Sequence, residues 1–365
     1  MASGSIPVLE VRGGHRQVGQ QIGEGQRPSL RRLLDRLRGA LPAGVSWPEM
    51  VQRGQRYLAP SRATYPQYVD ELEGIAQGAG LPFEELFVGM CEELWTADAG
   101  PRGCTDMAAR GRATADGSTL LAHTNDLGPE AEEDLVILKV KAGDEPQFLG
   151  ISPGGLAYSA GFNAAGIGLT GNEVEANDTR VGVPRLLVVR AILAARRLEE
   201  ALDACLLPGR ASSYNNVVGD ANGEVYSMEG SATDCVPIYI EDDVLAHANH
   251  YAAPAMRRFE ANPGDMGGSL IRHHRAWRLL RENRGRLSPQ LFQELLADHA
   301  NYPGSICKHG LTTVTVFSLI VCLEERRAWI GRGRPCQAQY EEHVLEPWVP
   351  PADWLILGTR RQPGV

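Results

Sequence analysis

Hydrophobic positions in the first hundred residues recur at the three- and four-residue spacing of amphipathic helices. Proline favours the first turn of a helix and glycine ends helices, so these residues mark where the segments begin and stop. Helices are predicted over residues 29–37, from Pro66 to the glycines at 78–80, and from Pro82 through Leu94. One short apolar run, residues 6–11, has the pattern of a strand. We therefore expect residues 1–103 to form a separate, mainly helical segment.

After residue 104 the pattern changes to short apolar runs separated by glycine-rich turns, which is typical of strands. Strands are predicted over residues 119–123, 135–140, 148–151, 167–170, 216–219, 224–229, 237–241 and 244–246, with a final hairpin over 314–323 and 327–331. Helices are predicted over residues 185–205, 269–283 and 289–299. Blocks of strands that alternate with helices indicate an α+β fold, with a sheet-on-sheet core covered by helices. Residues 104–365 would form this sandwich.

The composition is that of an ordinary globular protein, with 43% hydrophobic and 22% charged residues in a chain of 365. The formal net charge of −9 disfavours a nucleic-acid partner, because phosphate backbones attract positively charged surfaces. No uncharged run of about 18 apolar residues is present, so no membrane span is predicted. Residues 12–16 interrupt any apolar core of a secretion signal, and we therefore expect a cytoplasmic protein.

Seven cysteines are scattered along the chain, without a CxxC pair or a cysteine–histidine cluster that has zinc-ligand spacing. No metal and no other cofactor are therefore expected. Cysteines of this kind are usually reduced, buried and weakly polar. They are Cys91, Cys104, Cys205, Cys235, Cys307, Cys322 and Cys336.

Cys104 has the position of a candidate nucleophile. It follows Gly103 where the helical pattern changes to strands, and the first residue of a strand is a rigid mount for a reactive side chain. Gly103 can adopt backbone angles that are closed to other residues, so a strained peptide bond is possible there. If the bond between the two residues is cut, Cys104 gains an α-amine with a pKa of about 7.7–8.0, which can act as a general base for its own thiol.

A series of short motifs follows Cys104-Thr105 in a fixed order. The motifs are residues 120–126 (LLAHTND), 161–166 (GFNAAG), 182–184 (GVP), 245–250 (LAHANH) and 301–307 (NYPGSIC). Together with glycines 14, 19 and 23 and residues 73–78 (EGIAQG), this series resembles the acyl-coenzyme A:6-aminopenicillanic-acid acyltransferase family of autoproteolytic N-terminal-nucleophile (Ntn) cysteine enzymes. The resemblance implies a four-layer αββα sandwich.

The resemblance also implies roles for individual residues. The precursor would cut itself between Gly103 and Cys104, and the Cys104 thiol would become the nucleophile. Asp126 matches an aspartate that orients the new N-terminus, where an ionised carboxylate favours the ammonium form. Asn249 matches an asparagine whose amide donates to the developing oxyanion, a contribution of about 10²–10³ in rate.

The family places the neighbourhood of Thr105, Ser305 and Lys308 close to the substrate. Lys308 stands where the penicillin enzyme has an arginine, and lysine keeps the charge but loses the bidentate fork. Residues 123–127 replace an aromatic-rich stretch of the acyl pocket. The resemblance therefore supports the family's reaction more strongly than it supports the penicillin substrate.

The implied reaction is the cleavage or formation of a linear amide bond of a small molecule through a Cys104 thioester. Water gives an amidohydrolase, and an amine acceptor gives an N-acyltransferase. An acyl-coenzyme A or acyl carrier would serve as an acyl donor substrate. The two chains left by self-cleavage are expected to stay associated, because the amphipathic helices of residues 1–103 would otherwise expose their apolar faces.

Two alternatives stay open. One is an unprocessed cysteine hydrolase with a histidine base, for which His123, His247 and His250 are the candidates. The other is a non-catalytic relative that acts as a binding protein. We interpret these three histidines as structural residues with satisfied polar groups, and residues 272–275 (RHHR) as the solvated face of a helix.

Overall fold

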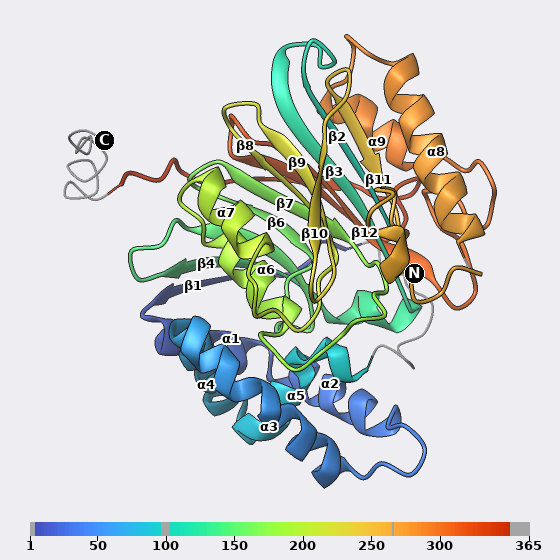
Figure 1. Cartoon of the computed structure of the whole chain (residues 1–365). Helices are drawn as coiled ribbons and strands as arrows, with labels where there is room; N and C mark the ends of the chain where they lie inside the picture. The colour runs from blue at the N-terminus through green and yellow to red at the C-terminus, as the bar shows by residue number, and fades with distance from the viewer. Residues whose placement is uncertain (1–3, 96–102, 265, 351–365) are drawn as a thin grey trace, which may run out of the picture.

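The computed structural model describes residues 4–95, 103–264 and 266–350. Two β-sheets pack face to face, and helices cover both outer faces (Figure 1). The chain is therefore an α+β protein with four layers in the order αββα. The predicted sheet-on-sheet core covered by helices is confirmed.

The first sheet has eight strands. In spatial order they are β1 (Val8–Gly13), β4 (Leu135–Ala142), β5 (Phe148–Pro153), β6 (Ala160–Asn163), β7 (Ile167–Asn172), β8 (Asn215–Asp220), β9 (Val225–Gly230) and β10 (Cys235–Tyr239). Neighbours are antiparallel, except that β1 runs parallel to β4. Parallel neighbours need a long connection, and here that connection contains the whole N-terminal helical region.

The second sheet has six antiparallel strands. In spatial order they are β11 (Val244–His247), β2 (Gly103–Gly111), β3 (Gly117–Leu127), β12 (Val314–Cys322), β13 (Arg327–Arg332) and β14 (Tyr340–Val344). The predicted C-terminal hairpin is β12–β13. As predicted, Cys104 lies at the start of a strand, where it is the second residue of β2.

Three clusters of buried apolar side chains hold the layers together. One lies between the sheets and joins Ile151 and Phe162 of the first sheet to Leu319 of the second. Another packs the outer face of the first sheet against the N-terminal helices and against α6 (Arg185–Leu193) and α7 (Leu198–Cys205). The third packs the second sheet against α8 (Gly267–Glu282) and α9 (Pro289–Leu296). Each sheet is thus buried on both faces, which explains its nearly continuous apolar runs.

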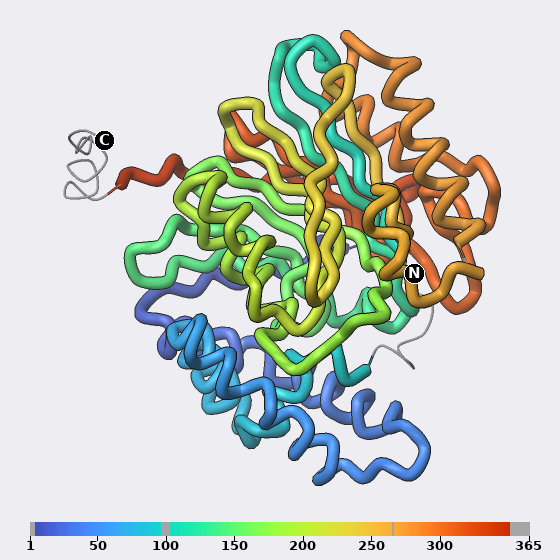
Figure 2. Tube along the Cα trace, viewed as in Figure 1, coloured from blue at the N-terminus to red at the C-terminus, as the bar shows by residue number. Residues whose placement is uncertain are grey.

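The N-terminal region contains five helices, which Figure 2 shows gathered in blue beside the first sheet. They are α1 (His15–Gly25), α2 (Arg27–Gly39), α3 (Trp47–Thr64), α4 (Pro66–Ala79) and α5 (Phe83–Met90), followed by a short 3₁₀ turn over Glu92–Leu94. Helices α1 and α4 cross so closely that only glycine fits: a Cβ at Gly19 would lie 1.9 Å from the Glu71 carbonyl oxygen. A Cβ at Gly74 would lie 2.2 Å from the Arg16 carbonyl oxygen.

The mainly helical N-terminal region also contributes one strand to the sandwich, where the sequence predicts a strand over residues 6–11. Strand β1 belongs to the eight-stranded sheet, where Val8 pairs with Ile137 and Val11 with Val140. The N-terminal region is therefore built into the sandwich through a strand as well as through helix packing.

The prediction of a single helix over residues 185–205 is wrong, because α6 ends at Leu193 and α7 starts at Leu198. Asn163 at the end of β6 explains the break. Its amide donates to the carbonyl oxygens of Leu193 at 3.0 Å and Ala195 at 2.7 Å, which satisfies acceptors at the end of α6. The Asn163 side chain thus fixes the end of a helix as well as its own turn.

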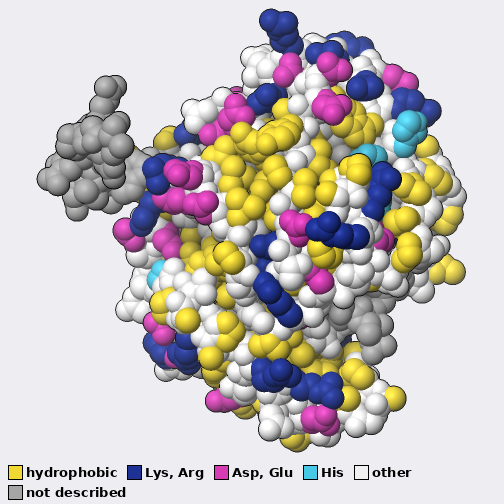
Figure 3. Space-filling view, in the orientation of Figure 1, with side chains coloured by type: hydrophobic (Ala, Val, Ile, Leu, Met, Phe, Trp, Pro, Cys, Tyr) yellow, Lys and Arg dark blue, Asp and Glu magenta, His cyan; other side chains and the backbone are white. Residues whose placement is uncertain are grey.

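The face of the molecule drawn in Figure 3 carries acidic and basic side chains interspersed, with hydrophobic side chains gathered over β9 and β10. Tyr239 at the end of the edge strand β10 is 65% exposed and contacts the ring of Tyr226. Among the described residues, no helix combines the length and apolarity needed to cross a membrane.

Candidate active site

Cys104 is the second residue of β2 and lies opposite Asn125 of β3, while Gly103 lies opposite Asp126. The Cys104 side chain forms part of the wall of a cavity of about 460 Å³, a size suited to a small molecule. The strand pairing explains why Asp126 and Cys104, 22 positions apart in the sequence, occupy the same end of the sheet.

The backbone nitrogen of Cys104 donates a hydrogen bond to Oδ1 of Asn249 at 2.9 Å. The guanidinium of Arg272 donates to the same oxygen at 2.5 Å. Two donors that point at one atom fix the orientation of the amide, and its Nδ2 accordingly donates to the carbonyl oxygen of Glu173 at 3.0 Å. The structure therefore brings the predicted residues Cys104 and Asn249 into direct contact.

Arg272 was not predicted as a site residue, and its assignment to the solvated face of a helix is wrong. It is 4% exposed, and its Nε also donates to Oγ1 of Thr105 at 3.3 Å. No local pattern indicates this inward orientation, because the flanking histidines and Arg275 have the composition of a surface. A buried guanidinium beside two predicted site residues adds a positive charge to the site.

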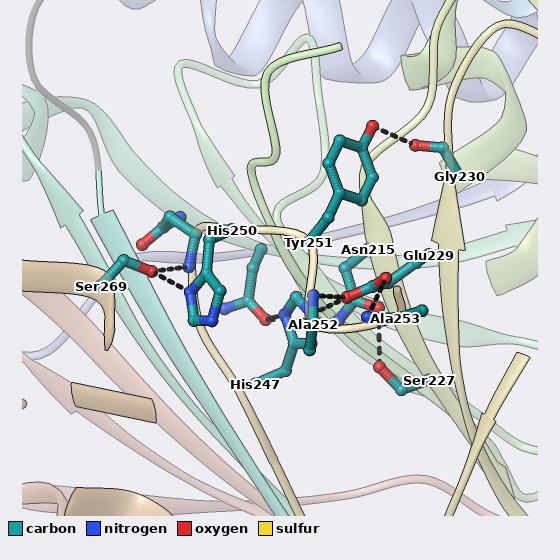
Figure 4. A network of polar contacts seen from close by, with 12 residues as sticks. Asn215, Ser227, Glu229, Gly230, His247, His250, Tyr251, Ala252, Ala253 and Ser269 are labelled. Atoms are coloured by element: carbon teal, nitrogen blue, oxygen red, sulfur yellow. Dashed lines mark hydrogen bonds and ion pairs between the residues drawn. The ribbon is translucent and has the colours of Figure 1, made fainter. Parts of the chain in front are cut away.

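The loop that carries Asn249 is held by a buried polar network (Figure 4). Ser269 Oγ accepts from the backbone nitrogen of Asn249 at 2.7 Å and contacts Nδ1 of His250 at 2.7 Å. Glu229 accepts from the backbone nitrogens of Ala252 at 2.6 Å and Ala253 at 3.0 Å. Satisfied networks of this kind make a loop rigid, so Asn249 is held by its surroundings and not only by Cys104.

Asp126 is fully buried beside Gly103. Its Oδ1 accepts from Oγ1 of Thr315 at 2.7 Å, and its Oδ2 lies 3.7 Å from Nζ of Lys308. Burial raises the pKa of the Asp126 carboxyl, while the charges of Lys308 and Arg272 oppose the rise. Burial also lowers the pKa of the Lys308 ammonium, against the opposing effect of Asp126.

Lack of space accounts for a glycine at position 103. A Cβ there would lie 2.8 Å from Nζ of Lys308 and 2.9 Å from Oδ2 of Asp126. Any larger residue would push these two groups away from the bond before Cys104.

Burial raises the pKa of the Cys104 thiol above its usual range, and the carboxylates of Asp126 and Asp106 raise it further. The thiol is therefore neutral at physiological pH and needs a base to become a nucleophile. Asn125 Nδ2 lies 3.9 Å from Sγ and 3.3 Å from Nε2 of His123. His123 in turn contacts the buried Asp106 through Nδ1 at 2.6 Å, so it reaches the thiol only through Asn125.

The interpretation of His247 and His250 as structural residues agrees with their contacts. Both ring nitrogens of His247 are engaged, by Asn172 Oδ1 at 2.9 Å and by Glu229 Oε1 at 2.7 Å. Burial and the neighbouring His247 lower the pKa of His250 to about 4. The two occupied nitrogens of His247 argue against this ring as a base for the thiol.

The cavity is bounded by the N-terminal region as well as by the sandwich. Leu37 of α2 and Trp95 supply apolar wall, and Arg185, Glu173 and Asn215 supply polar groups. The described side chains that line it do not include three predicted substrate contacts, Thr105, Ser305 and Lys308. Ser305 is buried and donates to the carbonyl oxygen of Cys307 at 2.6 Å.

The family model described as acyl-coenzyme A:6-aminopenicillanic acid acyl-transferase matches residues 113–337. The 40 kDa form of acyl-coenzyme A:6-aminopenicillanic-acid-acyltransferase from Emericella nidulans is 26% identical over 333 residues, which cover 87% of this chain and 90% of that protein. The beta-alanyl-dopamine/carcinine hydrolase of Drosophila melanogaster is 27% identical over 258 residues, covering 62% of this chain and 65% of that protein.

Two solved structures share part of the arrangement at low identity. The C2A mutant of conjugated bile acid hydrolase from Clostridium perfringens is 11% identical, with a TM-score of 0.47 over 66% of this chain and 92% of that chain. Penicillin V acylase from Agrobacterium tumefaciens is 12% identical, with a TM-score of 0.38 over 63% and 83%. The family model matches more than half of the sequence, and the protein therefore belongs to the acyl-coenzyme A:6-aminopenicillanic acid acyl-transferase family.

Proposed function

We propose that this protein is a self-processing Ntn cysteine enzyme that cleaves or forms a linear amide bond of a small molecule. The observation that carries the proposal is the hydrogen bond of 2.9 Å between the backbone nitrogen of Cys104 and Oδ1 of Asn249. A peptide nitrogen becomes an α-amine when the bond before it is cut. The amine would then sit next to its own thiol, already oriented by Asn249.

Self-cleavage starts when Sγ of Cys104 attacks the carbonyl carbon of Gly103. The peptide C–N bond breaks as the C–S bond forms, and the nitrogen takes the thiol proton. Water then hydrolyses the thioester and leaves a carboxylate on Gly103 and a free α-amine on Cys104. A Cβ on Gly103 would contact both Asp126 and Lys308, so these two side chains lie beside the scissile bond.

In the reaction with substrate, the α-amine takes the thiol proton while Sγ attacks the acyl carbon. An amide group has two N–H donors. One Nδ2 hydrogen of Asn249 is used by Glu173, and we assign the second to the developing oxyanion. The α-ammonium passes its proton to the leaving amine, and a thioester remains. Water then gives the free acid, whereas an amine acceptor gives a new amide.

The substrate is proposed to be an acylated amine, or an acyl-coenzyme A with an amine acceptor. The two curated relatives are named for an acyl transfer and for a hydrolysis, and one thioester intermediate supports both outcomes. The cavity combines apolar wall from α2 with polar groups such as Glu173 and Asn215, which suits an acyl chain joined to a polar amine.

The two chains produced by the cut are proposed to stay together. Arg190 of α6 is buried and donates twice to Glu71 of α4, at 2.9 and 2.8 Å, and once to Glu145 at 3.0 Å. Strand β1 and the apolar packing around α1 and α4 add to this contact.

The test is the intact mass of the freshly purified protein under denaturing conditions. The uncut chain has a mass of 39.6 kDa. Cleavage before Cys104 predicts about 11 kDa and about 28 kDa, since mass scales with length. Cys104→Ala should give the single uncut mass and no turnover. Two masses from Cys104→Ala, or wild-type turnover by it, would reject the proposal.

A second candidate is the unprocessed hydrolase with a histidine base. It is favoured by one observation, the buried Asp106–His123 contact at 2.6 Å, since an oriented histidine is a common base for a thiol. It predicts one uncut, active chain whose turnover disappears in His123→Asn. Two masses in the wild-type protein would exclude it.

A further inference from the structure

Four side chains from two distant segments converge at one point outside the cavity. They are His299, Cys307, His309 and Cys336, called here the four-ligand cluster. The first three lie in the connection between α9 and β12, and the fourth lies between β13 and β14. One ligand atom from each lies within 4.8 Å of every other. The spacing of these four residues along the chain does not indicate the cluster, because only folding brings Cys336 to the other three.

The separations from His309 are close to those around a tetrahedral metal ion, one of them slightly shorter. Nε2 of His309 lies 3.1 Å from Nε2 of His299, 3.4 Å from Sγ of Cys307 and 3.5 Å from Sγ of Cys336. Zinc has bonds of about 2.3 Å to sulfur and about 2.0–2.1 Å to nitrogen, which place tetrahedral ligand atoms roughly 3.3–3.8 Å apart. We propose that the four-ligand cluster is a structural zinc site with two cysteine and two histidine ligands.

Hydrogen bonding does not account for this arrangement. A ring nitrogen either carries one hydrogen or accepts through one lone pair. Nε2 of His309 has three potential partners within 3.5 Å, and one of them is a second ring nitrogen. A single cation at the centre gives all four atoms a partner at once.

The chemistry of the ligands selects the ion. Two thiolates neutralise the charge of one divalent cation, and each thiol releases its proton when the metal binds. Two sulfur and two nitrogen ligands in a tetrahedron favour zinc over magnesium or calcium, which prefer oxygen. Four protein ligands leave no open position, so the site would be structural and not catalytic. His299 and Cys336 are exposed, which gives the ion a route from solvent.

The site would join two parts of the chain beside the proposed active site. Lys308, between two of the ligands, lies 3.7 Å from Asp126. Zinc bound to Cys307 and His309 would therefore fix the backbone on both sides of Lys308 and tie it to the β13–β14 connection. This inference concerns metal binding and does not depend on the proposed reaction.

The first test is metal content. The full-length protein, expressed with added zinc and dialysed against a weak chelator, should retain about one zinc per chain. Cys336→Ser and His299→Ala, both at exposed positions, should each lower the retained zinc by about tenfold or more. The matched controls are Cys235→Ser and His274→Ala, which lie outside the cluster and should keep the wild-type content.

The second test uses cobalt(II) as a spectroscopic probe. Cobalt in the cluster should give the strong visible bands of four-coordinate geometry and a thiolate charge-transfer band, and Cys336→Ser should lose part of the latter. Zinc content of wild-type protein no higher than that of the two cluster variants would overturn the proposal. So would a mass showing that Cys307 and Cys336 are joined as a disulfide in freshly purified protein.

Discussion

The side-chain oxygen of Asn249 accepts a hydrogen bond from the backbone nitrogen of Cys104, although the two residues are 145 positions apart in the sequence. In the proposed mechanism this nitrogen belongs first to the scissile peptide and later to the free α-amine. One acceptor would therefore hold the same atom before and after self-cleavage. The two roles of Asn249, as acceptor through oxygen and as donor through nitrogen, can be separated by substitution.

Asn249→Asp keeps an oxygen opposite Cys104 but removes the amide donor. We expect this variant to cut itself and then to lose about 10²–10³ in turnover of an acylated amine, because the oxyanion loses one hydrogen bond. Intact mass and steady-state rates measure the two effects. Asn249→Leu removes both functions and should remain uncut. A processed Asn249→Asp protein with wild-type turnover would contradict the donor role.

Gly103→Ala should slow or stop self-cleavage. The new methyl group would lie within 3 Å of Lys308 and Asp126, so one of them must move away from the scissile bond. The expected destabilisation is about 1–3 kcal/mol. Intact mass followed over hours reports the cut. Gly39→Ala is the control, because nothing lies within 4 Å of a Cβ there. Equal cutting in both variants would mean that the crowding at Gly103 does not matter.

Arg190→Met should weaken the association of the two chains. Removing Arg190 takes the guanidinium away from the buried carboxylate of Glu71 and the half-buried carboxylate of Glu145, which keep the His15 ring beside them, a loss of about 3–5 kcal/mol. We expect the small chain to separate from the large one at a lower urea concentration, as measured by size-exclusion chromatography. The exposed substitution Arg31→Met should leave this concentration unchanged. If both behave alike, the buried ion pair does not hold the chains together.

Stability should fall as the pH drops from about 6.5 to about 4, in part because of His250. Its folded-state pKa of about 4 lies below the usual value of 6.5, so the unfolded chain binds the proton first. The stability that His250 gives above pH 6.5 is lost progressively toward pH 4, by about 3 kcal/mol. Urea unfolding at several pH values should show a shallower fall in His250→Gln, while the exposed His274→Gln should follow the wild type.

Periodicity was sufficient to predict a sheet-on-sheet core covered by helices, because it distinguishes amphipathic helices from strands buried on both faces. The four-layer αββα order followed from the family resemblance. It was less reliable where a distant side chain decides a boundary. Asn163 ends α6 through the carbonyls of Leu193 and Ala195. Such a contact has no local signature. Strand β6, of only four residues, was not predicted.

Site residues that belong to sequence motifs could be predicted, whereas residues that only packing brings to the site could not. Cys104, Asp126 and Asn249 come together as the motif order suggested, although their catalytic roles stay predictions. Arg272 was missed because its neighbours on α8 have the composition of a surface. Cys336 was missed as a cluster partner because its proximity to His309 depends on the pairing of β13 with β12 and β14.

The parallel pairing of β1 with β4 has a further consequence under the proposed self-cleavage. Before the cut, both strands belong to one polypeptide, and recovery from unfolding is independent of protein concentration. After the cut, one sheet is shared by two polypeptides, and recovery becomes a second-order encounter that dilution slows. The order of events, folding first and cutting second, would then be built into the enzyme, and a mature molecule that lost its short chain would expose the unpaired edge of β4.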